Sequence, residues 1–213
     1  MPGLRKSLVE DSSSLLQAGA KGGRQGNVLL LRHPDVPWPI CDCVTRGPQS
    51  FGRALHLELG SGQEREAALV CNSAGMPFQD SSFKRVVLWH VIDTGDEPEL
   101  VEACRVLAHG GELLVLGINP YGLRSRLESE AKALPRLHSS RLEVRLHELS
   151  MEVDAVHGIG FYGVTNRIVR RGQVSGLLLP FVDLLLIRAK PIDTTPMNAL
   201  RLDQFQAGVA PTS

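Results

Sequence analysis

The chain has 213 residues, of which 43% are apolar and 5% aromatic, and its 23 basic residues balance its 23 acidic ones. This size and composition predict one globular domain around a single core, and they exclude a chain that is disordered throughout. A net charge of zero provides no general field for a polyanion, and the longest basic patch runs only from Arg167 to Arg171. We therefore expect no nucleic-acid partner.

No segment is typical of a membrane span or of an export signal. The most apolar stretch, residues 176–187, is interrupted by Pro180 and Asp183 and is shorter than the roughly 20 residues of a spanning helix. The first 26 residues lack the apolar core of a signal peptide. We expect a cytoplasmic protein with no membrane partner. No metal site is expected either, because the cysteines lack zinc-site spacing. They are Cys41, Cys43, Cys71 and Cys104.

The first half of the chain alternates apolar runs with turn residues. Residues 1–26 form a polar lead-in, with a short helix expected around residues 7–18. Apolar or β-branched runs then predict five strands, several of them stopped by glycine, proline or asparagine. The five are residues 27–32, 54–59, 67–71, 83–89 and 112–117. A helix is predicted from Asp96 to Leu107, because acidic residues and Pro98 begin an apolar stripe with a 3.6-residue period.

The second half continues this pattern before changing it. Residues 123–134 and 139–149 are predicted helices, the second with Ser139 or Ser140 as its N-cap. Residues 151–162 and 181–189 are predicted strands six and seven, and the short approach to the last one predicts antiparallel pairing. The result is an α/β fold, a seven-stranded and mostly parallel sheet with helices on both faces. This domain spans residues 27–190, and a flexible tail is expected over residues 191–213.

Four motifs in the middle of the chain resemble a known family. They are M-P-F-Q-D-S-S-F (76–83), V-V-L-W-H-V-I (86–92), E-A-C-R-V-L (102–107) and G-G-E-L-L-V-L (110–116). Together they resemble the central block of class I S-adenosylmethionine-dependent methyltransferases. The segments G-I-N-P-Y-G-L-R (117–124) and V-D-L-L-L-I-R-A-K-P (182–191) resemble parts of a bacterial subgroup. The resemblance implies a Rossmann-like methyltransferase fold and S-adenosylmethionine as the cofactor.

The chain departs from the family at the cofactor loop. The family's first strand ends in G-x-G-x-G, because only glycine lets the backbone approach the cofactor closely. Residues 57–62 (L-E-L-G-S-G) imitate this loop, but only 13 residues separate them from Met76, too few for a helix, a strand and a helix. The spacing instead makes residues 27–32 the first strand and 54–59 the second. The loop that follows the first strand, residues 32–37, then contains no glycine.

On this register the resemblance implies cofactor-binding residues near the ends of the first three strands. These are Arg32, His33, Glu58, Asn72, Ser73 and Met76. Glu58 falls where the family holds both ribose hydroxyls with an acid, although a solvated strand-end residue explains it equally well. Asn72 replaces the aspartate that faces the adenine amino group, and its amide oxygen can still accept that hydrogen bond.

Three further residues are candidates for the chemistry. His90, after the fourth strand, is the predicted catalytic residue: it would line the methionine end of the cofactor or act as a general base. The alternative is a structural histidine at a strand end. Asn119 and Tyr121 lie after the fifth strand, where acceptors enter in this family, and the alternative is a loop that caps the next helix.

The sequence thus predicts methyl transfer from S-adenosylmethionine to a small-molecule acceptor. The alternative is a catalytically inactive methyltransferase-like domain that acts as a binding or assembly subunit, and the missing glycine after the first strand favours it. A homodimer or a protein partner is compatible with either function. A nicotinamide-dependent oxidoreductase is disfavoured, because G-x-G-x-x-G is absent after the first strand.

Overall fold

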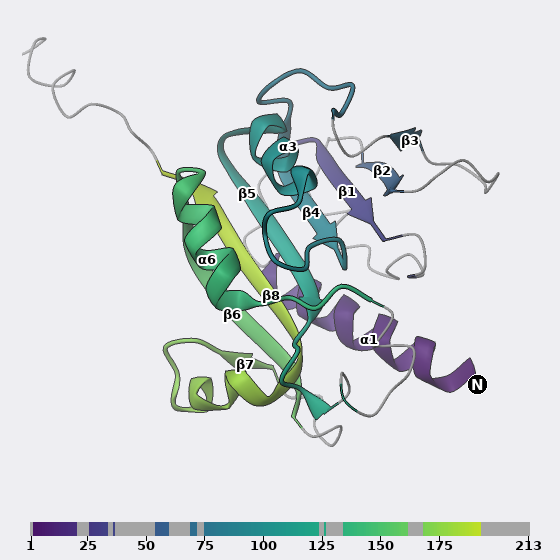
Figure 1. Ribbon diagram of the computed structural model, residues 1–213, viewed down its shortest axis with the longest axis vertical. Helices are drawn as coiled ribbons and strands as arrows, with labels where there is room; N and C mark the ends of the chain where they lie inside the picture. The colour runs from purple at the N-terminus through teal and green to yellow at the C-terminus, as the bar shows by residue number, and fades with distance from the viewer. Residues whose placement is uncertain are drawn as a thin grey trace, which may run out of the picture.

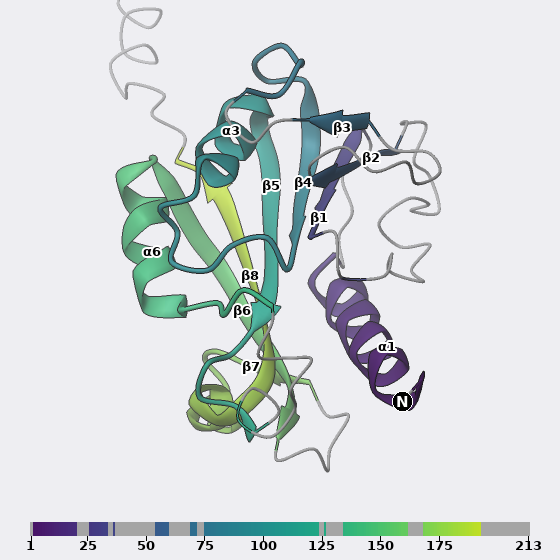
Figure 2. The ribbon, with the colours of Figure 1, turned by 45° about the vertical axis from the view of Figure 1, so that its right-hand side comes forward.

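A central sheet carries helices on both faces in the computed structural model (Figure 1). The structure describes residues 2–20, 26–33, 36, 54–59, 69–71, 75–123, 126, 134–161 and 168–192. Within these residues the helices are α1 (Pro2–Gly19), α3 (Pro98–Val106), α6 (Ser139–Glu148) and the 3-10 helix η1 (Val174–Phe181). Helix α1 lies on one side of the sheet, and α3 and α6 lie on the other (Figure 2).

The described part of the sheet has eight strands in the order β3-β2-β1-β4-β5-β8-β6-β7. The strands are β1 (Val28–Arg32), β2 (Ala54–Leu59), β3 (Leu69–Cys71), β4 (Phe83–Trp89), β5 (Leu107–Ile118), β6 (Met151–Phe161), β7 (Val169–Arg170) and β8 (Val182–Pro191). Strands β3, β2, β1, β4 and β5 pair in parallel, whereas β8 is antiparallel to both β5 and β6. The sheet is therefore mixed.

The register that was inferred from loop lengths is confirmed. Strand β1 lies between β2 and β4, with Val28 opposite Ala54 on one side and Arg85 on the other. Residues 54–59 form the second strand, next to the centre, as the short distance to Met76 required. The antiparallel strand near the end of the chain is confirmed as β8, which pairs Ala189 with Leu113.

The number of strands needs one correction. Seven were predicted, and the additional strand is β7, which pairs with His157 and Gly158 at the edge of β6. Only two residues form it, too few for any periodic pattern in the sequence. Several boundaries also differ from the prediction, most clearly at β5 and α6. Strand β5 begins at Leu107 directly after α3, and the N-cap of α6 is His138 rather than Ser139 or Ser140.

Helix α1 is longer than the short helix predicted within the lead-in. Its buried side chains Leu15 and Leu16 pack with Leu30, Trp89 and strands β5, β6 and β8. Its last residue packs closely on β8, because a Cβ at Gly19 would lie 2.3 Å from Leu186 Cδ2 and the leucine side chain would have to shift. The helix thus forms one wall of the core.

Parts of several predicted segments lie outside the described residues, most of all in the helix 123–134 and in the tail. Of the predicted helix 123–134, the structure describes only Leu123, Arg126 and Leu134, and of the tail it describes only Pro191 and Ile192. None of the described helices is both long enough and apolar enough to cross a membrane.

Candidate functional site

The carboxyl ends of the parallel strands meet at one edge of the sheet, where ligands bind in open α/β folds. Arg32, the last residue of β1, stands opposite Glu58 on β2 and opposite Trp89 on β4. The His33 N–H donates a hydrogen bond to the Trp89 carbonyl (3.1 Å). The structure therefore brings the backbone of Arg32, His33 and Glu58 together at this edge. Asn72 and Ser73 lie outside the described residues.

An arginine closes the turn that follows β1. The buried guanidinium of Arg32 donates through Nη1 to the carbonyl of Val36. The Val36 N–H donates in turn to the His33 carbonyl (3.1 Å), and the Val36 side chain packs with Leu15 and Leu16 of α1. The chain thus folds back onto the sheet through a side-chain contact.

His90 links the end of β4 to α1. Its backbone has a positive φ of 53°, its N–H donates to the Leu116 carbonyl (2.8 Å), and its ring is fully buried. Nε2 of the ring lies 3.4 Å from the Ser12 hydroxyl oxygen. Burial, and then the charge of nearby His33, lowers the pKa of His90 to about 3. The ring is therefore neutral at physiological pH, and its geometry suits a residue that positions α1 against this edge.

Asn119 joins the end of β5 to the start of β8. Its buried side-chain amide donates through Nδ2 to the carbonyls of Val182 (2.8 Å) and Pro180 (3.0 Å). Its Oδ1 accepts a hydrogen bond from the Tyr121 N–H (3.1 Å). The two segments approach so closely that only glycine fits beside them, because a Cβ at Gly122 would lie 2.6 Å from the Val182 oxygen. Asn119 therefore fixes the loop after β5 against η1.

A cavity of about 350 Å³ opens between these two segments. Tyr121 and Phe181 are 61% and 49% exposed, unusually high for large apolar side chains. The lining residues are Tyr121, Leu123, Arg126, Pro180 and Phe181. The cavity therefore offers aromatic and aliphatic walls and one guanidinium, which suits a small apolar ligand with an anionic group. Tyr121 contacts this space directly, whereas Asn119 lies beneath it.

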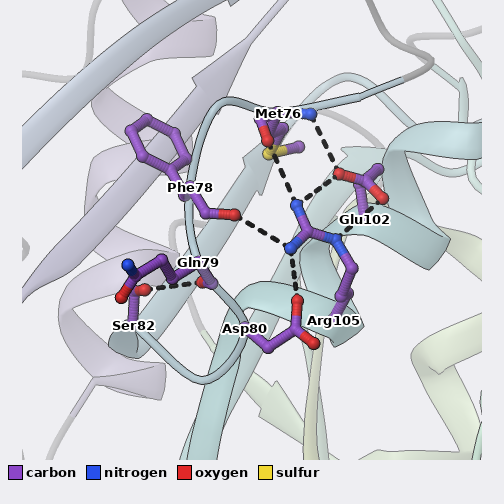
Figure 3. A network of polar contacts seen from close by, with 7 residues as sticks. All are labelled: Met76, Phe78, Gln79, Asp80, Ser82, Glu102 and Arg105. Atoms are coloured by element: carbon purple, nitrogen blue, oxygen red, sulfur yellow. Dashed lines mark hydrogen bonds and ion pairs between the residues drawn. The ribbon is translucent and has the colours of Figure 1, made fainter.

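Met76 takes part in a polar network with α3, which the sequence analysis missed (Figure 3). The Met76 N–H donates to Glu102 Oε2 (2.9 Å), and its carbonyl accepts from Arg105 Nη2 (3.1 Å). Arg105 also binds the Phe78 carbonyl (2.9 Å) and the Asp80 carboxylate. The hydrogen bond from Arg105 is the main reason that the pKa of Glu102 is lowered. The i, i+3 spacing of Glu102 and Arg105 was the only sequence signal.

A second feature that sequence reasoning missed is the carboxylate of Glu97. Its Oε1 accepts the backbone N–H groups of Asp93 (2.9 Å) and Thr94 (2.8 Å), and its Oε2 accepts that of Gly95 (2.8 Å). Burial raises the pKa of Glu97, but these hydrogen bonds outweigh it, so the pKa is lowered overall. Glu97 therefore organises the loop that leads from β4 and His90 into α3.

Of the four cysteines, only Cys104 has a described side chain, and it lies on α3. Burial raises the pKa of the Cys104 thiol to about 12, so it is not a nucleophile at neutral pH. Cys41 and Cys43 lie outside the described residues, and of Cys71 only the backbone is described. Within the described part of the chain, no three acidic, histidine or cysteine side chains gather as metal ligands would.

No protein-family model matches the chain, and no curated protein matches it. Solved structures do. One is a chain in the complex of the Haloferax volcanii Trm112 methyltransferase activator with the putative methyltransferase. It is 13% identical, with a TM-score of 0.55, and the match covers 88% of this chain and 93% of that chain. Geranyl diphosphate C-methyltransferase from Streptomyces coelicolor A3(2), solved with Mg²⁺, geranyl diphosphate and S-adenosyl-L-homocysteine, is 14% identical (TM-score 0.54, 85% and 79% covered).

A putative methyltransferase from Bacillus halodurans C-125 is also similar, with 16% identity, a TM-score of 0.50, and 84% of this chain and 99% of that chain covered. At such low identity the likeness establishes the fold. The chain has the Rossmann-like fold of S-adenosylmethionine-dependent methyltransferases, as the motifs between residues 76 and 116 predicted.

Proposed function

We propose that the protein transfers a methyl group from S-adenosylmethionine to a small-molecule acceptor. The observation that carries this proposal is the strand register at the carboxyl edge of a methyltransferase fold. In this register Glu58 on β2 stands opposite Arg32 on β1. An acid at the end of β2 is next to the loop after β1, where this fold takes its nucleotide. An apolar cavity at the end of β5 supplies a place for the acceptor on the same edge.

The residue types at this edge support a site for the cofactor. A carboxylate at the position of Glu58 suits a ribose diol, because charge-assisted hydrogen bonds are the strong ones. His90 is neutral, so it adds no positive charge against a sulfonium. The Arg32 guanidinium donates a hydrogen bond to the Val36 carbonyl and so holds the turn after β1 in place. When bound, S-adenosylmethionine would supply an electrophilic methyl group, and this edge would orient it with Glu58, His33 and Asn72.

On the acceptor side, Tyr121 and Phe181 would hold the apolar part of the substrate and Arg126 an anionic part. Asn119 would hold the two walls of the cavity together, because it binds the backbone of Val182 on one side and of Tyr121 on the other. Alignment of a nucleophilic acceptor with the methyl group supplies most of the rate in such a reaction, so no general base is required. His90 would then serve as a positioning residue at the end of β4 rather than as a base.

The proposal is tested by release of S-adenosylhomocysteine from S-adenosylmethionine in the presence of a panel of small aromatic and aliphatic acids. At least one panel member should stimulate release above the rate without acceptor. Tyr121→Ala should abolish the stimulation, whereas Val144→Ala, which shortens an exposed apolar side chain on α6, should not. Equal loss in both variants would remove the cavity from the proposal.

The contact between Arg32 and Val36 favours a second candidate function, a binding or assembly subunit without turnover. The turn after β1 is closed by a buried guanidinium, and the loop 32–37 contains no glycine that would let the cofactor approach. The similar Haloferax volcanii chain belongs to a complex of a methyltransferase activator with a putative methyltransferase, which supports a protein partner for this chain. Absence of any S-adenosylhomocysteine binding would favour this second function.

A further inference from the structure

A second cavity, of about 370 Å³, lies between β6, β7 and β8, far along the sheet from the edge described above. Strand β6 is four strands from β1, which corresponds to about 19 Å at the usual spacing between strands. The charged and titratable residues that line this cavity are Asp154, His157, Arg170, Arg171 and Arg188. The proposed methyl transfer uses none of them.

Only part of the positive charge at this cavity is neutralised. Asp154 Oδ2 binds both Arg188 Nη2 (2.6 Å) and Lys190 Nζ (2.8 Å), so one carboxylate serves two cations. The Arg188 guanidinium also donates through Nη1 to the carbonyl of Gly19 at the end of α1 (2.9 Å). This side of the cavity therefore retains an excess of one positive charge.

The other side carries a further excess charge on β7. Arg171 donates through Nη1 to both carboxylate oxygens of Glu143 on α6 (2.9 Å each) and is thereby neutralised. Arg170 is exposed and pairs with no acidic side chain among the described residues. With Lys190 and Glu143, the ion-pair partners of lining residues, four cations stand against two carboxylates, which leaves two positive charges for a ligand.

Two buried nitrogens next to the cavity also lack partners. His157 is only 5% exposed, and its Nδ1 has no hydrogen-bond partner among the residues that the structure describes. The same holds for Nε of Arg188. Burial, and then the charges of Arg170 and Arg188, lower the pKa of His157 to about 4, although Asp154 acts in the opposite direction. The arginines therefore dominate the potential at the imidazole.

We propose that this cavity binds a small phosphorylated molecule through its phosphate dianion, with Arg170 as the principal contact. Two uncompensated positive charges match the charge of a phosphate monoester, and arginine presents paired donors to phosphate oxygens. The volume lies in the range of small-ligand sites. A polyanion is a poorer match, because the chain as a whole has no net charge. The site does not depend on the proposed methyl transfer.

The experiment is an NMR titration of the whole chain at constant ionic strength, with inorganic phosphate and with glycerol phosphate as probes. The ring signals of His157, assigned by their loss in His157→Gln, should shift with both probes. The pKa of His157 should rise when phosphate is bound, because the anion offsets the field of Arg170 and Arg188. Tighter binding of glycerol phosphate would identify the ligand as an organic phosphate, whereas equal affinity would identify free phosphate.

The decisive variant is Arg170→Gln, which should still fold because the side chain is exposed. It should weaken phosphate binding about ten- to a hundredfold, the usual effect of losing one charge-assisted contact. Arg141→Gln, which removes an exposed charge from α6 beside Thr94 and Asp96, should leave the affinity unchanged. Equal weakening in both variants would mean general charge attraction and would overturn the proposal.

Two other results would also overturn it. One is the absence of any shift of the His157 signals at millimolar phosphate. The other is salt-sensitive binding of a single-stranded oligonucleotide without binding of glycerol phosphate, which would point to a nucleic-acid surface. Glu58→Ala should not affect phosphate binding, so failure of the proposed methyl transfer and failure of this site can be told apart.

Discussion

Nε2 of His90 and the Ser12 hydroxyl lie 3.4 Å apart and join two segments that are 78 residues apart in the sequence. His90 follows β4, whereas Ser12 lies in the middle of α1. Both side chains are fully buried. Helix α1 is thus anchored at the same edge of the sheet that carries Arg32 and Glu58, and a proton on His90 would have to be accommodated inside the core.

The first prediction concerns acid stability. An unfolded histidine takes up a proton near pH 6.5, whereas folded His90 does so only near pH 3. His90 therefore makes the free energy of unfolding fall as pH drops from 6.5 toward 3, by up to about 1.4 kcal/mol per pH unit. His90→Gln should reduce this slope in urea unfolding between pH 4 and 7. Part of the slope should remain, because the pKa of His157 is also lowered, to about 4.

The control for this experiment is His147→Gln on α6, where the side chain is exposed. Its slope should match that of the unmodified protein. If His90→Gln and the unmodified protein lose stability equally per pH unit, the ring is protonated in the folded state and is not sealed in the core.

A second prediction concerns Glu97. Its folded-state pKa lies below the ordinary value of 4.5, so its contribution to stability is complete above about pH 4.5 and is lost as pH falls through the lower folded-state value. Glu97→Ala should lower the free energy of unfolding at pH 7 by about 1 to 2 kcal/mol, because three backbone N–H groups lose their acceptor. Chemical unfolding at pH 7 and pH 4 measures both effects. Glu99→Gln, in the first turn of α3, should change neither, and an equal effect would mean that only the negative charge at the start of the helix matters.

The assignment of the first two strands could be predicted because it depends on chain length and apolar runs. Residues 57–62 look more like a cofactor loop than residues 32–37 do, yet the short distance to Met76 excluded them, and β1 and β2 pair as that argument required. Strand β7 could not be predicted, because its two residues acquire their pairing only from the edge of β6.

The candidate site could be predicted only as a set of strand ends. The position of Arg32 was foreseen, but its contact with the Val36 carbonyl depends on how the loop folds back on α1. For Asn119 the sequence left an acceptor contact and a cap of the next helix open, and neither indicated that its amide binds carbonyls about 60 residues further along the chain. Likewise, nothing in the sequence around His90 indicates that Ser12 lies beside it.

A third prediction separates the two residues after β5. Asn119→Ala should lower the free energy of unfolding by about 2 to 3 kcal/mol, because the carbonyls of Pro180 and Val182 lose a buried donor. Tyr121→Ala should change it by no more than about 0.5 kcal/mol, since that side chain is exposed. Thermal and urea unfolding of both variants provide the comparison. A large loss for Tyr121→Ala would make its ring part of the core rather than a wall of the cavity.

The central claim is that this edge of the sheet binds S-adenosylmethionine, and calorimetric titration with S-adenosylhomocysteine tests it most directly. We expect a dissociation constant in the high micromolar range, which is a binding free energy of about −4 to −5.5 kcal/mol, because the loop 32–37 has no glycine. Glu58→Ala should bring binding below detection, since a charge-assisted contact is worth about 1.5 to 3 kcal/mol, whereas Glu99→Gln should bind as the unmodified protein does. Nanomolar binding would contradict the assignment of the glycine-free loop, and no heat at millimolar ligand would contradict the claim itself.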